Sequence, residues 1–408
     1  MNVIFSRLIA FFCTITAFYA FRISKLGVHS SVGELLMNAM NDKYPLQNDL
    51  MVRAARGEKV ERTPIWIFRQ AGRHLPEYNE YKKTTNKNFL ELLDDPADVT
   101  ECTMQPIRRY DLDAAILFSD ILVILQAYGI EVSMPGGVGI QVPEPLANPS
   151  EIYSRLPSGK VDVHDKLSHV ITAVTSIKEE LKGKVPLIGF SAAPWTLMYY
   201  MVGGSSKKNQ RIGQSWLDNH PEESQALLDM LTDTVIDYMS AQIDAGADMI
   251  QVFEAMGEFV NEESFYKWCI PSLSRIATEL KSKHPNVPLL VFPRGATYAL
   301  KDMQRIGYDV VTLDTQTNRQ EIRAILKEKE NLPSSGKISV VQGNLDVSLL
   351  KAGESSVSAV EAGVKTMLEE LGPHKLIANL GEGLTGQEDP EYVNAFVESV
   401  HKISEEMM

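Results

Sequence analysis

The stretch IWIFRQAGRHLPEY, residues 65–78, opens with a short run of β-branched and aromatic residues and continues with a polar segment. Short apolar runs of this kind are typical of buried β-strands. Similar runs recur along the chain, and a longer segment with helical periodicity separates each run from the next. The strand candidates are 65–68, 114–118, 186–191, 248–253, 288–292, 308–313, 338–342 and 375–380. Strands that alternate with helices predict an α/β protein with a parallel sheet.

The segments between these runs carry apolar residues at the spacing of a helix. Pro221 followed by Glu222 and Glu223 indicates a helix start, and Gly246 indicates a helix end. The helix candidates are 165–182, 221–245, 263–284, 317–329 and 355–371. Because no break in composition divides the strand–helix units, they predict a single (β/α)₈ barrel within residues 34–408.

A doubly wound parallel sheet is the structural alternative. That fold has a glycine-rich turn after its first strand, whereas residues 69–78 read RQAGRHLPEY. The glycines of 133–146, SMPGGVGIQVPEPL, precede no helical pattern. They therefore predict a hairpin or lid loop and not a nucleotide-binding fingerprint.

Composition limits the possible functions. The chain has 408 residues, of which 44% are hydrophobic, and a formal net charge of -13. A chain this long and apolar does not belong to the disordered class, and its charge disfavours binding to nucleic acid or to an anionic membrane. An anionic substrate would need a locally basic pocket. The cysteines, Cys13, Cys102 and Cys269, form no CxxC pair, which argues against a disulfide framework and a cysteine zinc site.

Residues 1–33 differ from the rest of the chain. Arg7 precedes an apolar run over residues 8–21, and the stretch after it is basic, contains several serines and has no acidic residue before Glu34. This pattern predicts a targeting leader that is removed, so that no membrane span remains in the mature chain. Ala20-Phe21 resembles the cleavage motif of two-part plastid leaders in algae with secondary plastids. We therefore expect a plastid location reached through a secretory-type leader; a membrane anchor, or an unremoved helix on a cytoplasmic protein, is the alternative.

Residues just past the carboxyl end of each barrel strand are expected to face the active site. They are Arg69 and Gln70, Ser119 and Asp120, 192–195, Glu254 and Ala255, Pro293 and Arg294, Asp314, 343–346 and 381–383. This set combines arginine, carboxylate and glycine, and it offers no pair of histidines for a metal. We therefore expect no metal site.

Arg69 and Arg73 are four residues apart, so that both would lie on one face if the segment were helical. Guanidinium groups suit carboxylates or phosphates, although a solvated basic face or a structural salt bridge would use them equally well. Asp120 follows a buried run and needs partners, which could be the next helix start, N–H donors or a cation in the pocket.

Other candidates are weaker when taken alone. Tyr200 lies in an aromatic and methionine-rich stretch, 189–204, which is more typical of a core than of a site. The glycines of the turn after the last strand, 381–386, indicate unusual backbone angles or a close ligand. The histidines are scattered, and we expect His74 and His401 at the surface.

Several of these blocks together resemble uroporphyrinogen decarboxylases. They are RTPIWIFRQAGRHLPEY (62–78), AAILFSDILV (114–123), LIGFSAAPWTLMYYMV (187–202), VVQGNLD (340–346) and GPHKLIANLG (372–381). The resemblance is in order and extends from about residue 46 to residue 405. It implies a single barrel, usually a homodimer with facing clefts. It also implies an enzyme without a cofactor that removes CO₂ from the four acetate side chains of uroporphyrinogen, with coproporphyrinogen as the product.

The resemblance also implies roles for individual residues. It implies catalytic roles for Asp120, Arg69 and Tyr200. It implies substrate binding by Arg69, Gln70, Ala71, Gly72, Arg73, Asp120, Tyr200, Ala255, Arg294 and Glu382. The chemistry agrees, because a substrate with eight carboxylates needs arginine at the cleft, and a protonated pyrrole can accept the electron pair of the broken C–CO₂ bond. A fixed carboxylate facing the pyrrole N–H groups would stabilise that cation. The proton donor stays open, because arginine is a weak acid.

The chain departs from the family pattern at three positions. Glu382 replaces the histidine of the usual NLGHG, Ala255 replaces a serine or threonine, and Arg294 replaces a lysine. A carboxylate at 382 would repel a substrate carboxylate unless it is protonated or turned away. A paralogue that binds porphyrinogen as a carrier or regulator with little turnover is therefore a second hypothesis. A methyltransferase relative with a zinc site is a third.

Overall fold

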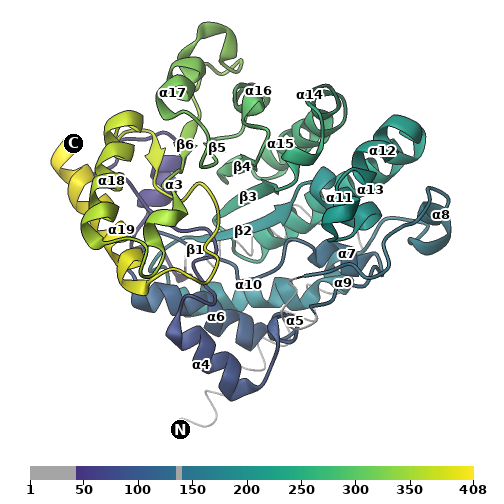
Figure 1. Cartoon of the computed structure of the whole chain (residues 1–408), viewed down its shortest axis with the longest axis horizontal. Coiled ribbons are helices and arrows are strands. Elements are labelled where there is room, and N and C mark those ends of the chain that lie inside the picture. The colour runs from purple at the N-terminus through teal and green to yellow at the C-terminus, as the bar shows by residue number, and fades with distance from the viewer. Residues whose placement is uncertain (1–42, 135–139) are drawn as a thin grey trace.

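The computed structural model of the protein describes residues 43–134 and 140–408. Its centre is one parallel sheet whose strands pair in chain order, from β1 to β7, with helices outside it (Figure 1). The strands are β1 (Ala115–Ile116), β2 (Leu187–Ala192), β3 (Met249–Glu254), β4 (Leu289–Pro293), β5 (Val310–Thr312), β6 (Val340–Gln342) and β7 (Leu376–Ile377). The predicted leader, 1–33, lies outside the described residues.

The segment 64–66 closes the barrel between β7 and β1. Ile65 forms a parallel bridge with Ala378, and its carbonyl accepts a hydrogen bond of 2.8 Å from the N–H of Asp113. The predicted first strand, 65–68, is thus only a bridge. Beyond it, side chains replace strand partners, because the N–H of Phe68 donates to Oδ1 of Asn379 at 3.0 Å. The predicted (β/α)₈ barrel is confirmed.

Helices surround the strands on the outside of the barrel (Figure 1). The α-helices are α3 (Leu50–Ala55), α4 (Pro76–Thr85), α5 (Phe89–Leu93), α6 (Pro96–Arg109), α7 (Val123–Ala127), α8 (Glu151–Arg155), α9 (Val163–Lys166), α10 (Ser168–Leu181), α11 (Pro194–Gly203), α12 (Ile212–Asn219), α13 (Pro221–Asp244), α14 (Glu262–Ser264), α15 (Ile270–Lys283), α16 (Leu300–Ile306), α17 (Arg319–Lys327), α18 (Val357–Leu371) and α19 (Pro390–Met407). The shorter turns are η2 (Lys207–Asn209), η3 (Gly257–Phe259), η4 (Phe265–Cys269), η5 (Thr297–Ala299), η6 (Lys329–Asn331) and η7 (Val347–Leu350).

The predicted helix 221–245 is α13, and Gly246 ends it at a φ of 118°. The predicted hairpin within 133–146 has an antiparallel bridge between Ser133 and Gln141. Residues 135–139 of that hairpin lie outside the described residues. These agreements follow from local signals, because a proline, a glycine or a turn acts on its own few residues.

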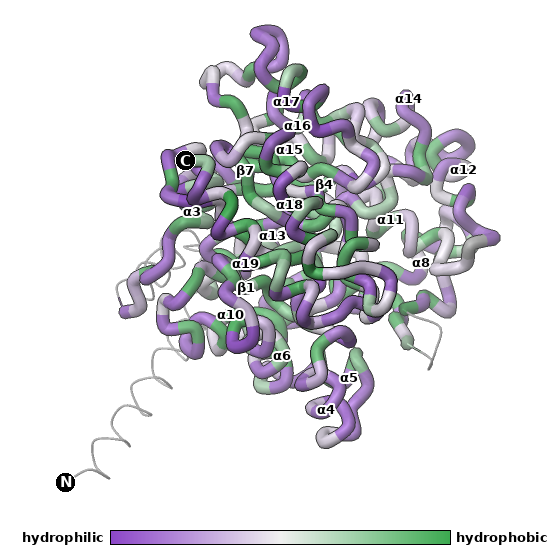
Figure 2. The backbone as a smooth tube through the Cα atoms, turned by 60° about the vertical axis from the view of Figure 1, so that its left-hand side comes forward, coloured by the Kyte–Doolittle hydropathy of each residue, from purple (hydrophilic) through white to green (hydrophobic). Residues whose placement is uncertain are grey.

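The barrel interior has an apolar layer at its amino-terminal end and an aromatic layer at its carboxyl-terminal end. A polar layer lies between them. Inward residues such as Met249 and Leu290 are fully buried, and α3 packs against them at the amino-terminal end. In the polar layer, Gln342 accepts from the indole N–H of Trp66 at 2.8 Å and donates to Thr312 at 2.8 Å. Figure 2 shows the hydrophobic segments gathered at the centre and hydrophilic ones toward the periphery.

Aspartates tie the strands together at the amino-terminal face. Asp113, Asp248 and Asp309 each precede a strand and accept from an N–H at the start of the preceding strand or, for Asp113, of the preceding bridge. Those donors are Ile65 at 2.9 Å, Leu187 at 2.8 Å and Leu289 at 2.9 Å, and the cations beside the carboxylates are Arg62, Lys178, and Lys281 with Lys337. Buried carboxylates need such partners. This face is therefore built for stability.

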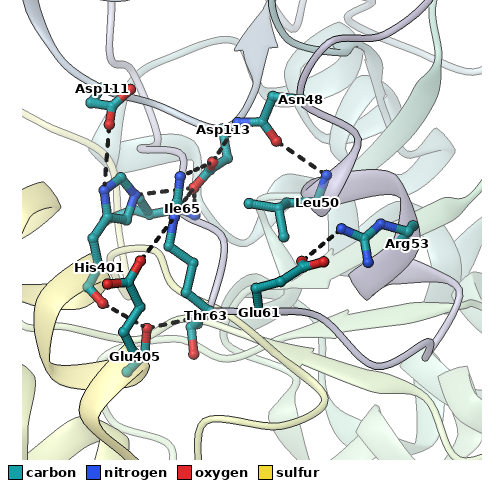
Figure 3. Close-up of polar contacts among 12 residues, drawn as sticks. Asn48, Leu50, Arg53, Glu61, Thr63, Ile65, Asp111, Asp113, His401 and Glu405 are labelled. Carbon is teal, nitrogen blue, oxygen red and sulfur yellow. Dashed lines mark hydrogen bonds and ion pairs between the residues drawn. The ribbon is translucent and has the colours of Figure 1, made fainter. Parts of the chain in front are cut away.

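The predicted surface positions of His74 and His401 are wrong. The ring of His401, on α19, lies 3.2 Å from Asp113, and Figure 3 shows it among the contacts of that carboxylate. His74 is 5% exposed and lies parallel to the ring of Tyr110. Both histidines are covered by segments distant in the sequence, which is why local pattern could not place them.

Candidate functional site

Three phenylalanines form an apolar layer at the top of the barrel interior. Phe68 and Phe292 are stacked with their ring centroids 5.2 Å apart, and Phe253 meets Phe68 edge to face at 5.7 Å. Each of them directly precedes a residue that was predicted to lie at the mouth. Side chains alternate between the two faces of a strand, so each phenylalanine points away from its neighbour and into the barrel. The layer therefore lies beneath the carboxyl-terminal mouth of the barrel. Nothing local in the sequence distinguishes these three residues from ordinary strand core.

Asp120 lies at this mouth, just after β1, and is 9% exposed. Its Oδ1 accepts a hydrogen bond of 2.6 Å from the N–H of Leu122. Burial raises the pKa of Asp120 to about 6, while that hydrogen bond and the charge of Arg69 act in the opposite direction. The carboxylate is thus held by backbone on one side and interacts with Arg69.

Arg69 is exposed at the mouth and has a φ of 60°. The segment from Arg69 to His74 consists of turns and bends and is not helical, so the condition under which the two arginines would share a helical face is not met. A Cβ at Gly383 would lie 2.7 Å from Cδ of Arg69, so the arginine side chain crosses the loop after β7 in direct contact. The positive φ and the close glycine contact direct Arg69 to this loop.

Arg73 reaches the same loop four residues farther on. Its Nη2 donates to the carbonyl oxygen of Thr385 at 2.6 Å. A Cβ at Gly386 would lie 2.7 Å from Cβ of Arg73, and Gly386 has a φ of 96°. The loop after β7 therefore receives both arginines, although their spacing alone gave no sign of it.

Tyr200 projects from α11 and is half-buried. Burial raises the pKa of Tyr200 to about 12; Tyr199 and Asp120 act in the same direction, and Arg69 and Arg294 oppose them. Its ring packs edge to face on that of Tyr199 at 5.4 Å. The structure therefore brings together Arg69, Asp120, Tyr200 and Arg294, which come from four different loops and helices.

Arg294 lies between two carboxylates. Its Nη2 is 4.0 Å from Oε2 of Glu382, and its Nη1 is 3.8 Å from Oε1 of Glu258. All three side chains are 40–48% exposed, so solvent screens these pairs. The carboxylate of Glu382, which departs from the family pattern, thus faces the arginine that also departs from it. Glu258 was not predicted, because nothing local marks it.

The remaining residues that were predicted to bind substrate are less exposed to solvent. Gln70 is buried, and its side chain accepts from the N–H of Ile67 at 3.2 Å and donates to the carbonyl of Ala114 at 3.3 Å. Ala71 and Gly72 are partly buried in the turn between the two arginines. The N–H of Ala255 donates to Oγ1 of Thr196 at 2.8 Å.

Glu254 anchors α11 behind the barrel wall. It is fully buried, and burial raises its pKa to about 7. Its Oε1 accepts hydrogen bonds from the hydroxyl of Thr196 and, at 3.3 Å, from the N–H of Met256. Because Thr196 lies one turn before Tyr200 on α11, this contact fixes the helix that carries Tyr200.

Three further observations concern the residues that the structure describes. Across residues 43–134 and 140–408, no three His, Cys, Asp or Glu side chains gather where they could hold a metal ion. In the same residues, no helix combines the length and the apolar character needed to cross a bilayer. Cys102 and Cys269 are both buried and free.

Comparison with known proteins decides the family. Residues 46–403 match the family model described as uroporphyrinogen decarboxylase (URO-D). The chain belongs to the uroporphyrinogen decarboxylase family. A uroporphyrinogen decarboxylase of Salinibacter ruber is 43% identical over 89% of this chain and 98% of its own length. The human uroporphyrinogen decarboxylase is 40% identical over 88% of this chain and 95% of its own.

Solved structures agree with the fold. A methyltransferase from Methanosarcina mazei superposes with a TM-score of 0.66 at 20% identity, over 86% of this chain and 97% of that one. At that identity the likeness concerns the fold alone. The decarboxylase family is therefore assigned by sequence, and the arrangement at the barrel mouth is a property of this chain.

Proposed function

We propose that the protein removes CO₂ from each of the four acetate side chains of uroporphyrinogen, with coproporphyrinogen as the product. One observation carries this proposal: a buried carboxylate, Asp120, interacts with Arg69 at the mouth of a barrel of this family, above an apolar layer. A tetrapyrrole with carboxylates on its rim and N–H groups at its centre matches that arrangement. An otherwise acidic protein has positive charge where the carboxylates would bind.

The reaction consumes one proton and releases one CO₂ for each acetate. Protonation at a ring carbon makes the pyrrole a cation, which accepts the electron pair of the breaking C–CO₂ bond. The exocyclic carbon then takes up a proton and becomes a methyl group, while the ring returns its proton. We assign Asp120 to the pyrrole N–H groups, where its charge stabilises the cation.

We assign Arg69 and Arg73 to substrate carboxylates, because guanidinium groups bind them through two parallel hydrogen bonds. Tyr200 is assigned to the reacting side chain, because its hydroxyl shares the electrostatic environment of Asp120 and Arg69. Arg69 as the proton donor itself is not proposed, since arginine is a weak acid.

The other predicted binding residues complete the proposal at the rim. Arg294 and Glu382 are assigned to one rim carboxylate, with Glu382 limiting the attraction of Arg294. Gln70, Ala71, Gly72 and Ala255 are assigned to the wall beside the ring. The side chain of Gln70 is engaged with backbone, so its contribution would be to hold the wall in shape.

An anaerobic assay tests the function. Freshly reduced uroporphyrinogen is incubated with the protein, and the oxidised products are separated by chromatography. We expect porphyrins with seven, six, five and four carboxyl groups to appear in turn, and none with Asp120→Ala. Tight binding of substrate without any seven-carboxyl product would contradict decarboxylation and favour a carrier. Isomers I and III of the substrate are compared in parallel.

We also propose a homodimer with facing clefts, supported by the resemblance to the family. Light scattering of the purified protein at several concentrations measures the assembly. A single species with the mass of one chain at all concentrations would contradict it.

For location, we propose a plastid, where the product would serve both haem and chlorophyll synthesis. The support is the leader over residues 1–33, with its basic and apolar segments and Ala20-Phe21. A fusion of residues 1–33 to a fluorescent protein tests the location. Diffuse cytosolic fluorescence would contradict it.

A further inference from the structure

Glu388 lies in the loop between β7 and α19 and is 4% exposed. Its carboxylate organises the turn that precedes it. Oε1 accepts from both the N–H and the hydroxyl of Thr385 at 2.8 Å, and Oε2 accepts from the N–H of Gly386 at 2.8 Å and that of Gln387 at 3.1 Å. One buried side chain thus binds every residue of the turn 385–387.

The same turn contacts Arg73. The carbonyl of Thr385 accepts from Nη2 of Arg73 at 2.6 Å, and Gly386 leaves room for the arginine side chain. Glu388 accepts from the N–H groups of these residues, whereas Arg73 donates to the carbonyl of Thr385 and packs against Gly386. A movement of the turn would therefore move the guanidinium.

The backbone around Glu388 is held independently of its side chain. The N–H of Asp389 donates to the carbonyl of Leu350 at 2.9 Å, and the N–H of Ala352 donates to the carbonyl of Gln387 at 3.0 Å. Asp389 separately caps α19 by accepting from the N–H of Glu391 at 2.9 Å. A substitution at Glu388 would consequently loosen the turn 385–387 while α19 keeps its start.

We propose that Glu388 is a positioning residue for substrate binding, which holds the turn 385–387 so that Arg73 presents its guanidinium to a rim carboxylate of the substrate. This rests on the proposed function of Arg73. Glu388 itself touches no substrate and acts through the turn.

Ionisation of Glu388 suits this role. Burial alone would raise its pKa, but the hydrogen bonds from Thr385 and Gly386 outweigh burial and hold the pKa below its ordinary value. A charged carboxylate offers acceptors to all the donors of the turn. In Glu388→Gln, the amide NH₂ would face N–H donors on one side, so about half of the contacts would be lost.

A double-mutant cycle tests the proposal in the full chain. Glu388→Gln, Arg73→Ala and the double variant are compared by steady-state kinetics with uroporphyrinogen. They are also compared by fluorescence titration with uroporphyrin, the stable oxidised octacarboxylate. We expect Glu388→Gln to raise KM and the Kd for uroporphyrin about 10-fold with kcat nearly unchanged, because a misplaced positioning group costs up to about 10²-fold. In the Arg73→Ala background, Glu388→Gln should add nothing.

Asp389→Ala is the matched control. It removes a carboxylate cap from the same loop, so it should lower the Tm, but it leaves the turn 385–387 in place and should leave KM unchanged. Equal effects of Glu388→Gln with and without Arg73 would overturn the proposal, as would a rise in KM with Asp389→Ala. If the unmodified protein binds uroporphyrin but decarboxylates nothing, the proposed function fails, and the uroporphyrin titration still decides the role of Glu388.

Discussion

Asp120→Asn should make the protein more stable and nearly inactive. Burial raises the pKa of Asp120 from the ordinary 3.8 to about 6, a difference of about 2.2 that corresponds to about 3 kcal/mol at about 1.4 kcal/mol for each pKa unit. The folded state therefore holds a proton that the unfolded state has lost between these pH values. The contribution of Asp120 to stability therefore falls as the pH rises from 3.8 to about 6, and above that range its ionised carboxylate destabilises the fold by the full amount.

Asparagine avoids this loss. Its Oδ1 can still accept from the N–H of Leu122, the 2.6 Å contact of the aspartate, but it carries no charge. We expect the free energy of unfolding of Asp120→Asn to exceed that of the unmodified protein by up to about 3 kcal/mol at pH 8 and by little near pH 4. The decarboxylation rate should fall by about 10²–10³, the effect of removing one preorganised electrostatic partner.

Urea denaturation at several pH values, followed by circular dichroism, measures the first effect, and the anaerobic assay measures the second. The rate of the unmodified protein should also rise as the pH passes through about 6, because the ionised form of Asp120 is the active one. Loss of stability at pH 8 in Asp120→Asn would show that the carboxylate serves the fold as a helix cap. Near-normal turnover would refute its catalytic role.

Glu382, His74 and Lys178 each allow a further test. Glu382→His should keep or raise activity and lower KM by at most about 5-fold, because it frees Arg294 from an exposed ion pair; a large loss in the assay would show a specific contact of Glu382. Burial lowers the pKa of His74 to about 4 from 6.5, so the contribution of His74 to the free energy of unfolding should fall by up to about 3 kcal/mol as the pH falls from 6.5 to 4, opposite in sign to that of Asp120. The free energy of unfolding of His74→Phe, relative to that of the unmodified protein, should therefore rise by up to about 3 kcal/mol as the pH falls from 6.5 to 4; a difference that does not change with pH would contradict the assignment. Lys178→Met should reduce the free energy of unfolding by about 3–5 kcal/mol, because it leaves Asp248 buried and unpaired; a reduction below about 1 kcal/mol would contradict it.

Much of the site could be located from strand ends alone. Arg69, Asp120 and Arg294 follow apolar runs directly, and the carboxyl ends of parallel strands meet at one face of a barrel. Arg69 contacts Gly383 and Arg294 faces Glu382, both in the loop after β7, while Asp120 follows the end of β1. Tyr200 was placed by resemblance, since its own stretch reads as core.

Other parts of the site were beyond local pattern. The spacing of Arg69 and Arg73 would place them on one face only in a helix, but Arg69 has a φ of 60° and the glycines of the loop after β7 receive both side chains. The position of Glu388 in the sequence does not indicate that its carboxylate binds a turn, or that the turn binds an arginine more than 300 residues earlier in the chain.

The spacing of apolar residues and the positions of proline and glycine in the sequence alone determined that strands and helices alternate around a closed sheet. They therefore also determined which residues lie at the open end of that barrel. These properties are local, because each strand or helix depends on its own neighbours. Only the folded chain decided how those residues are charged, held and paired. A pKa or an ion pair depends on burial and on groups brought close from distant segments, and spacing along the chain does not encode that proximity.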